Sequence, residues 1–463
     1  MKFPILYIVV FLCGASVMVV EIAGGRALYP YLGNTIYTWS GVIAVVMAAL
    51  SIGYWAGGRL GDRYADAKHL SYIIFFAGLA TMFAPPLTSI GGAVSYGMDI
   101  ALASVFAPLS LVPASLFYGM VAPYAVRLAS RKGNVGANAG NVFALSTVGS
   151  ITGVLAAGFL LIPNMGLSHV FLFTSFAMLA CSLALHLDRK RVFDAIVYVA
   201  LLILMGTFSF SPVFGDTLYQ KNSEYALITV VEKEGVKTLF IDNVASSAER
   251  DGEPVFGYVL VSARAFEIAP NPERGLVLGS AAGTQVEMLK REYPQIIVDA
   301  VDIDPLTVKI GREYFSFRDD ERTNVHIEDA RRFVSGREDE YGIVLIDAFK
   351  SHAPPPHLLS VEFVRAVKRS MKDDGVVAVN IIARLEDGGY LGHVHDTYAS
   401  VFGNVYVFPS GGRGEVQNIV IIATDASRPE FEEKYAGEMY GMGHIGRIIT
   451  DERNPVEVFA DYR

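Results

Sequence analysis

The chain changes its pattern of apolar and polar positions near residue 212. Before that point, long apolar runs follow one another with only short polar breaks between them. About seven of these runs are long enough to cross a bilayer core of about 30 Å. They lie near residues 3–23, 39–57, 70–90, 100–126, 136–162, 168–187 and 193–211. The pattern predicts an N-terminal bundle of about seven transmembrane helices.

Beyond residue 212 the apolar runs are shorter and their period changes. Residues 212–262 alternate apolar and polar positions, which predicts a small antiparallel β unit. From residue 263 onward, short apolar strands alternate with helical segments, as is typical of an open α/β sheet. We therefore expect a multi-domain chain: a transmembrane helical bundle at 1–211, a small β domain at 212–262 and a Rossmann-like α/β domain at 263–463.

The composition agrees with a chain that is half membrane and half soluble. Hydrophobic residues make up 52% of the sequence, and the mean hydropathy is +0.38. The formal net charge of -9 argues against nucleic acid as a partner. Both cysteines, Cys13 and Cys181, lie inside apolar runs, so we expect neither a disulfide framework nor a cysteine-based metal site.

The strongest chemical signal in the soluble half begins at a glycine-rich turn. Gly279 and Gly283 lie between a predicted strand and a helix expected near Thr284, where backbone can approach a ligand closely. Asp302 ends the next strand roughly 20 residues later, the spacing at which a carboxylate usually meets ribose hydroxyls. The turn alone is a weak signal, because a bare strand-to-helix turn also favours glycine.

Acidic residues recur at the ends of three consecutive predicted strands. They are Asp302, Asp304, Asp329 and Asp347, each at a strand end or just beyond it. A single aspartate at such a position is commonly a helix cap. Four in order are harder to explain as caps, and the carboxyl ends of parallel strands are where open α/β sheets bind ligands.

The order of these segments resembles the spermidine synthase (polyamine aminopropyltransferase) family. The resemblance rests on SEYALITVVE, LFIDN, LVLGSAAGT, VDAVDID, HIEDARRF, YGIVLIDAF and DDGVVAVNI, which together cover essentially the whole soluble half. GGRLGDR in the membrane half, PPPHLLSVEF and the late ITDERNPVE resemble the membrane-fused branch of that family. The resemblance implies a Rossmann-like domain of the S-adenosylmethionine-dependent transferase type.

Carried over residue by residue, the resemblance implies a site for S-adenosylmethionine or decarboxylated S-adenosylmethionine, used as a cosubstrate without a metal. Gly279 and Gly283 match the family's glycine-rich loop, and Asp302 matches the acid on the ribose hydroxyls. Asp329 and Ala330 match the pair of residues beside the adenine.

The resemblance also implies the residues that handle the acceptor. Asp347 matches the catalytic aspartate, which orients the attacking amine or accepts its proton. Tyr225 and Asp242 fall within the family's amine-binding segments. Lys350 is a candidate contact for an acidic or lipidic acceptor, and the alternative is an exposed loop position without a role.

Several positions depart from the family pattern. The family's loop acid, which binds the free amine of the decarboxylated cosubstrate, is replaced by Ala282. Phe256, Gly257 and Tyr258 stand in place of a Tyr-His-Glu motif, and Lys350 replaces a second acid. Because a diamine needs acceptors and carboxylates at both ends, we expect the cosubstrate pocket to be kept and a conventional putrescine pocket to be lost.

The sequence leaves four functions open. The family favours aminopropyl transfer to an amine, whereas loss of the loop acid removes an obstacle to an S-adenosylmethionine-dependent methyltransferase. An S-adenosylmethionine lyase that releases methylthioadenosine would need no acceptor. A nucleoside-sensing membrane protein or transporter is the fourth alternative, with Glu21 as its single intramembrane acid. The expected partners are a small-molecule acceptor and the lipid bilayer, and a homodimer is left open.

Loop charges bear on the orientation in the plasma (inner) membrane. Basic residues gather after the second, fourth and sixth apolar runs: Arg59, Arg63, Lys68, Arg127, Arg131, Lys132, Arg189, Lys190 and Arg191. By the positive-inside rule, these loops and the amino terminus are cytoplasmic. Seven spans would then place the C-terminal domain outside, although its implied cosubstrate is made in the cytoplasm. We expect a multi-pass protein, and the side of its C-terminal domain stays open.

Overall fold

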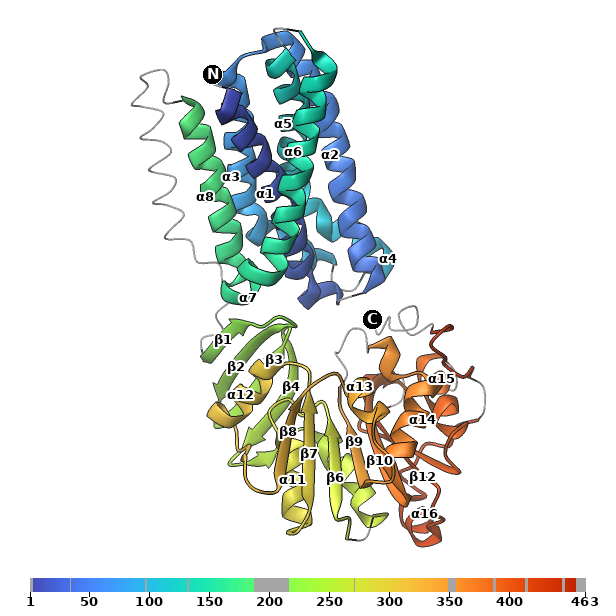
Figure 1. Ribbon diagram of the computed structural model, residues 1–463. Coiled ribbons are helices and arrows are strands. Elements are labelled where there is room, and N and C mark those ends of the chain that lie inside the picture. The colour runs from blue at the N-terminus through green and yellow to red at the C-terminus, as the bar shows by residue number, and fades with distance from the viewer. Residues whose placement is uncertain are drawn as a thin grey trace. The chain divides into compact units, whose positions relative to one another are not determined.

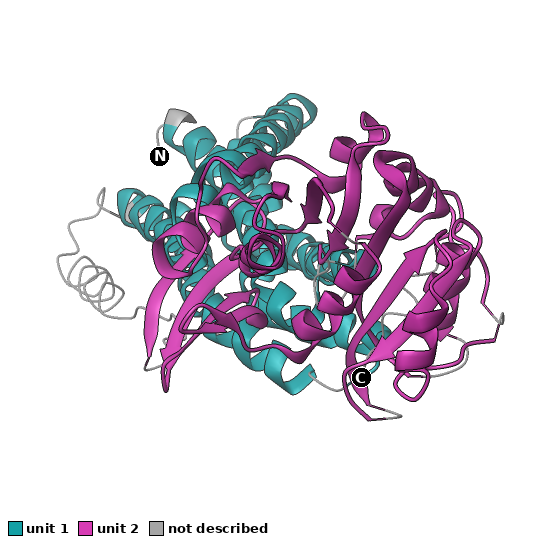
Figure 2. Ribbon diagram, turned by 90° about the horizontal axis from the view of Figure 1, so that it is seen from below, with its two compact units in different colours: residues 1–213 teal, residues 214–463 magenta. Residues whose placement is uncertain are grey.

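The chain divides into two compact units, Met1–Val213 and Phe214–Arg463 (Figure 2). The structure is a computed structural model. It describes residues 3–33, 35–95, 98–130, 133–186, 216–269, 271–348, 355–385, 389–412, 415–443 and 446–454. Each unit has its own hydrophobic core, so the two are described separately.

The first unit is a bundle of long apolar helices (Figure 1). They are α1 (Phe3–Leu32), α2 (Ile36–Tyr64), α3 (Ala67–Ser95), α4 (Ile100–Phe106), α5 (Val112–Ala129), α6 (Val135–Ala156), α7 (Ile162–Asn164) and α8 (Leu167–His186). Six helical stretches in the described residues are long and apolar enough to cross a membrane: Ile5–Leu32, Ile36–Tyr64, Ala67–Ser95, Ile100–Ala129, Val135–Asn164 and Leu167–Leu185. They correspond to the first six predicted runs. The seventh, 193–211, lies outside the described residues.

Small residues let α1 and α6 pack backbone to backbone. A Cβ atom added at Gly149 would lie 2.1 Å from the carbonyl oxygen of Phe11, and one added at Gly153 would lie 2.2 Å from that of Ala15. No side chain larger than hydrogen fits at either position. The recurring glycines therefore fix the closest approach of these two helices, as expected for apolar helices that associate by van der Waals packing.

The second unit begins with an antiparallel sheet of five strands (Figure 1). The strands are β1 (Thr217–Asn222), β2 (Leu227–Lys233), β3 (Val236–Ile241), β4 (Val244–Arg250) and β5 (Glu253–Pro254), paired in that order. Tight two-residue turns connect β2 to β3 and β3 to β4, with positive φ at Glu234 and Gly235 and again at Asp242 and Asn243. Such turns match the right-handed twist of paired strands, so the alternating pattern closes into hairpins.

The rest of the second unit alternates strands with helices. The strands are β6 (Arg274–Leu278), β7 (Ile297–Asp302), β8 (Thr323–Ile327), β9 (Tyr341–Ile346), β10 (Met371–Arg384), β11 (Asn404–Pro409) and β12 (Val416–Thr424). The helices are α10 (Gly257–Ser262), α11 (Thr284–Glu292), α12 (Pro305–Tyr314), α13 (Ala330–Ser335), α14 (Val361–Ser370), α15 (Gly389–Ala399) and α16 (Pro429–Tyr435). The predicted Rossmann-like α/β sheet is confirmed.

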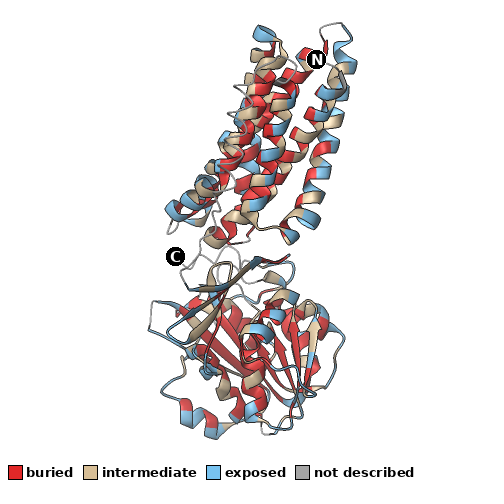
Figure 3. Ribbon diagram, turned by 90° about the vertical axis from the view of Figure 1, so that its left-hand side faces the viewer, coloured by how far each residue is buried: buried red, intermediate tan, exposed pale blue. Residues whose placement is uncertain are grey.

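The seven strands form one sheet in the order β11-β12-β10-β9-β6-β7-β8. Strands β6 to β10 pair in parallel, and β12 runs antiparallel to both of its neighbours. Apolar clusters cover both faces, so the central strands are buried (Figure 3). Strand order reverses between the neighbours β6 and β9. At such a switch point, a crevice opens beyond the carboxyl ends of the strands.

Candidate active site

The loop after β6 and the end of β9 meet at this switch point. Gly279 has a φ of 85°, and a Cβ added there would lie 2.6 Å from the carbonyl oxygen of Asp347. The amide of Asp347 donates to the carbonyl of Leu278 at 2.8 Å. Glycine therefore lets the two segments close on each other, which holds Asp347 beside the start of α11.

Three side chains from three elements donate hydrogen bonds to the Asp347 carboxylate. The Tyr258 hydroxyl of α10 and Nε2 of Gln285 in α11 lie 2.8 Å and 3.3 Å from Oδ2. Nδ2 of Asn380 in β10 lies 2.9 Å from Oδ1. Burial raises the pKa of Asp347 to about 6, although the hydrogen bonds from Asn380 and Tyr258 lower it. The group is therefore ionised at neutral pH and titrates just below it.

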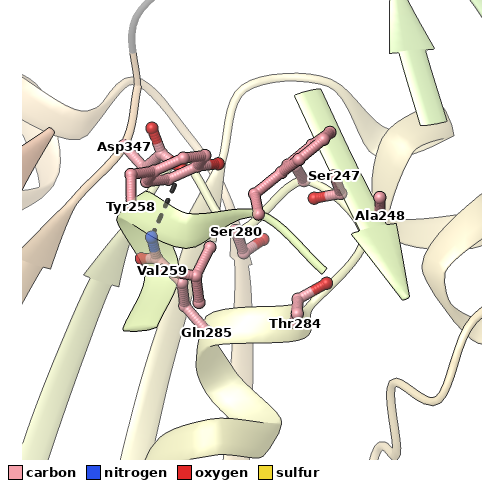
Figure 4. Close-up of a pocket in the computed structure, with 11 residues that line it drawn as sticks. Ser247, Ala248, Tyr258, Val259, Ser280, Thr284, Gln285 and Asp347 are labelled. Atoms are coloured by element: carbon pink, nitrogen blue, oxygen red, sulfur yellow. Dashed lines mark hydrogen bonds between the residues drawn. The ribbon is translucent and has the colours of Figure 1, made fainter. Parts of the chain in front are cut away.

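A cavity lies beside Asp347 (Figure 4), and its empty space, including the open solvent at its mouth, is about 280 Å³. Strand β4, helix α10, the β6–α11 loop, helix α11 and the end of β9 contribute its walls. The lining residues are Ser247, Ala248, Phe256, Tyr258, Val259, Gly279, Ser280, Ala281, Thr284, Gln285 and Asp347. Part of the antiparallel sheet thus completes a site whose acid comes from the α/β sheet.

Three polar atoms of the lining have no hydrogen-bond partner within the protein. They are Oγ of Ser280, Oγ1 of Thr284 and Oε1 of Gln285, all on side chains buried in this unit. Buried polar groups without partners are rare in folded proteins, because leaving one unsatisfied costs about 1–3 kcal/mol. The loop end of the cavity is therefore suited to a polar ligand.

Asp302 braces the glycine-rich loop. Its Oδ2 accepts the amide of Ala281 at 2.8 Å, and its Oδ1 accepts the amide of Asp304 at 2.9 Å. Burial raises its pKa above the usual value, and these backbone donors oppose the rise. Asp302 adjoins the site through the loop without lining the cavity, so its role on a ribose stays a prediction.

Two of the four strand-end aspartates are helix caps. Asp304 caps α12 by accepting the amide of Leu306, and Asp329 caps α13 by accepting the amide of Arg332. The other carboxylate oxygen of Asp329 lies 3.0 Å from Nε2 of His357. Capping accounts for one carboxylate oxygen of each aspartate, so a ligand contact of Asp329 stays a prediction.

Ala330 does not offer its side chain to the cavity. It is the first residue of α13, and its methyl group packs in the apolar cluster on one face of the sheet. The assignment of Asp329 and Ala330 to an adenine accordingly rests on the resemblance alone.

Ala282 does not line the cavity, so its place in a cosubstrate site stays a prediction. Its side chain is 1% exposed and packs with Ile228 and Ile310 between the antiparallel sheet and α12. The neighbouring Ala281 lines the cavity instead. The reason lies in the turn: Ala281 has a φ of 43°, and this left-handed residue sets which of the two alanines faces inward.

The predicted acceptor residues do not gather at the cavity. Asp242 lies in the β3–β4 turn, where its Oδ1 accepts the amide of Leu227 at 2.8 Å. Tyr225 is 38% exposed just before β2 and is absent from the lining. Lys350 lies outside the described residues.

Sequence reasoning did not select Tyr258, Gln285 or Asn380 as site residues. Asn380 carried a usable signal, because it interrupts the apolar run VVAVNII of a central strand, where a polar residue needs a buried partner. Tyr258 stands at a position where the family has an acid. Gln285 had no signal, since a glutamine in the first turn of a helix is common.

No group of three or more histidine, cysteine, aspartate or glutamate side chains with a metal-binding arrangement occurs in the part of the chain that the structure describes. The site is built from one carboxylate, neutral polar groups and backbone at a helix start.

An open α/β sheet with a glycine-rich loop and a buried carboxylate at its switch point defines a Rossmann-like ligand-binding domain. Residues 260–409 match the family model described as the spermine/spermidine synthase domain. The second unit therefore contains a spermidine synthase domain, and the predicted resemblance to this family of transferases is confirmed.

Curated relatives agree with this assignment. The chain is 29% identical over 228 residues to the polyamine aminopropyltransferase of Vibrio vulnificus, covering 46% of this chain and 73% of the relative. It is 22% identical over 430 residues to polyamine aminopropyltransferase 2 of Aquifex aeolicus, covering 85% of each. The second similarity extends into the helical unit.

Among solved structures, spermidine synthase from Thermotoga maritima is similar at 18% identity and a TM-score of 0.41, covering 52% of this chain and 82% of that one.

Proposed function

We propose that this chain is a membrane-anchored transferase that moves a three-carbon chain from S-adenosylmethionine or its decarboxylated form to an amine. The observation that carries the proposal is the Asp347 carboxylate, held in the cavity by three donors at the switch point of the sheet. The similarity to proteins named polyamine aminopropyltransferases supports the reaction type. With the decarboxylated cosubstrate, the transferred group is an aminopropyl group.

Asp347 has the properties that this reaction requires. An amine must lose its proton before it can attack the carbon beside a sulfonium. A carboxylate with a pKa of about 6 is ionised at neutral pH, so it can orient an ammonium group and take up its proton. The sulfonium is a good leaving group, so positioning of the two reactants supplies most of the catalysis.

The lining limits the kind of amine. Among the described residues that line the cavity, Asp347 is the only acid. Phe256, Val259 and Ala248 supply apolar wall. A diamine would leave its far ammonium without a carboxylate, so we propose an acceptor with one reacting amine and a neutral or apolar remainder.

Product analysis by mass spectrometry of the purified full-length protein tests the proposal. The protein is incubated with each cosubstrate form, with and without a panel of monoamines and diamines. Methylthioadenosine together with an alkylated amine supports the proposal. S-adenosylhomocysteine would indicate a methyltransferase, methylthioadenosine without an acceptor a lyase, and binding without turnover a sensor or transporter.

The matched substitution is Asp347→Asn. Because it removes the proton acceptor and keeps the side-chain shape, we expect turnover to fall about a hundredfold or more, with little change in affinity for methylthioadenosine. Asp373→Asn, at an exposed position of β10, is the control and should leave both quantities unchanged. Equal turnover in Asp347→Asn and wild type would remove Asp347 from the chemistry.

A further inference from the structure

The loop end of the cavity carries neutral hydrogen-bonding groups, one of which, Gln285, donates to the Asp347 carboxylate. Ser280, Thr284 and Gln285 are 5%, 8% and 6% exposed. Each has one polar atom without a partner within the protein, and all three line the cavity (Figure 4). The intervening Ala281 contributes only a methyl group and backbone.

These groups lie at the start of α11, a nine-residue helix whose N-cap is Gly283. The first amides of a helix have no intrahelical acceptor, and glycine has no side chain to cap them. Together with the dipole of the helix, such amides favour an anion. The hydroxyl groups of Ser280 and Thr284 add two donors suited to the same anion.

Gln285 supplies a hydrogen-bond acceptor beside these donors. Its Nε2 donates to the Asp347 carboxylate, so its Oε1 faces away from that oxygen as an acceptor, and this atom has no partner within the protein. An acceptor next to a set of donors suits a group that carries an ammonium and a carboxylate on one carbon, which is the end of an α-amino acid.

We propose that the Ser280–Gln285 segment binds the α-amino-acid end of intact S-adenosylmethionine, so that the group transferred is 3-amino-3-carboxypropyl rather than aminopropyl. This inference rests on the function proposed above and names its cosubstrate. Decarboxylated S-adenosylmethionine would leave the hydroxyl donors and the helix start without the anion they suit.

The chemical step changes only in the group that moves. The nitrogen lone pair of the acceptor attacks the methionine-chain carbon bonded to sulfur, and a carbon–nitrogen bond forms. The carbon–sulfur bond breaks with its electron pair going to sulfur, which converts the sulfonium into neutral methylthioadenosine. The proton released from nitrogen passes to Asp347. No oxidant or metal is required. The nitrogen lone pair supplies both electrons of the new bond, and sulfur keeps both electrons of the broken bond.

Ala281 offers a direct test. Its φ of 43° is a left-handed conformation, which aspartate and asparagine adopt more readily than most residues. Ala281→Asp places a carboxylate where an α-carboxylate would bind, whereas Ala281→Asn adds the same shape without charge. We expect the affinity for intact S-adenosylmethionine to fall about tenfold or more in Ala281→Asp relative to Ala281→Asn. The introduced carboxylate would repel the α-carboxylate of the ligand, and a repulsion equivalent to about one pKa unit is a factor of ten in affinity.

Two measurements on the full-length protein complete the test. Calorimetric affinity for methylthioadenosine, which lacks the amino-acid chain, should be the same in wild type and both variants, so it reports folding. Ser280→Ala with Thr284→Val should weaken intact S-adenosylmethionine about tenfold or more and leave its decarboxylated form little changed.

The products distinguish failure of the inference from failure of the proposed function. An aminocarboxypropylated amine formed with methylthioadenosine from the intact cosubstrate is the expected result. Turnover of the decarboxylated form alone, or stronger binding of that form by wild type, would overturn the inference and leave the proposed function standing. No methylthioadenosine from either form with any amine would overturn the proposed function itself.

Discussion

At the scale of single residues, Asp347 links the structure of the site to its pH dependence. Its carboxylate is buried and titrates near pH 6. Below that pH, the carboxylate oxygen that would accept a proton from the amine is already protonated. We therefore expect kcat/KM to fall on the acidic side of about pH 6, and a pH profile of methylthioadenosine release measures it.

The side chains that donate hydrogen bonds to Asp347 set the pH at which this limb falls. The hydrogen bonds from Asn380 and Tyr258 lower the pKa of Asp347, so removing either should raise it. Tyr258→Phe should move the acidic limb upward by about one pH unit, since a hydrogen bond to a charged group contributes about 1.5 kcal/mol. Tyr398→Phe, at a buried tyrosine outside the site, is the control. A limb unmoved in Tyr258→Phe would mean that another group titrates.

The same carboxylate affects stability with a definite sign. Its pKa in the folded chain lies above the ordinary value of 3.8, so the folded state holds the proton more tightly than the unfolded state. Stability from this group is therefore present at low pH and lost as pH rises through about 6. Between pH 7 and pH 5 the wild type should gain about 1 kcal/mol relative to Asp347→Asn. Thermal unfolding of both proteins across this range measures the difference.

At the scale of elements, the junction of β6, α11 and β9 is the part of the fold on which the site depends. Gly279→Ala would put a methyl group 2.6 Å from the carbonyl oxygen of Asp347 at a φ of 85°. Strain of this kind costs about 1–3 kcal/mol, and relief requires β9 to move away from the loop. We expect lower stability and loss of turnover together.

Gly336→Ala is the matched control for that substitution. Gly336 ends α13 with a negative φ of -104°, and a Cβ there would meet nothing within 4 Å. It should leave turnover and unfolding temperature close to wild type. Equal effects of the two substitutions would contradict a specific role for the junction.

The same scale explains why the strand-end acids have different hydrogen-bond partners. Asp304 and Asp329 follow strands β7 and β8 and begin helices, and the following helix amides occupy their carboxylates. Asp347 follows β9, and side chains from α10 and β10 donate to its carboxylate. The local sequence around the three acids is similar, so the pattern alone could not separate caps from a site.

At the scale of the whole molecule, the number of spans decides on which side the second unit lies. The described residues hold six candidate spans, and an even number returns the chain to the side of its amino terminus. The basic loops place that terminus in the cytoplasm. We predict six crossings and a cytoplasmic second unit, because the cosubstrate that the family resemblance implies is made in the cytoplasm.

Cysteine labelling tests this orientation. In a chain with Cys13→Ser and Cys181→Ser, a cysteine introduced as Glu430→Cys lies at an exposed position of α16. A membrane-impermeant maleimide should modify it in broken cells and not in intact ones. Modification in intact cells would place the unit outside and contradict the prediction.

The amino-acid sequence by itself determined the elements, because their signals are local. The length of the apolar runs, the period of alternation and the glycines of the turn all act over a few residues, and each was sufficient to predict bundle, β unit and α/β sheet. It also predicted Asp347 as a site residue, and this aspartate lines the cavity.

The rest of the site was decided only by tertiary structure. Tyr258 and Asn380 lie 89 and 33 residues from Asp347 in the chain and meet it through strand order and packing. Which of Ala281 and Ala282 faces the cavity depended on one left-handed residue in a turn. Contacts between distant segments produce no periodic pattern in a single sequence, and neither does the direction of a side chain in a loop. Both are therefore decided only when the chain folds.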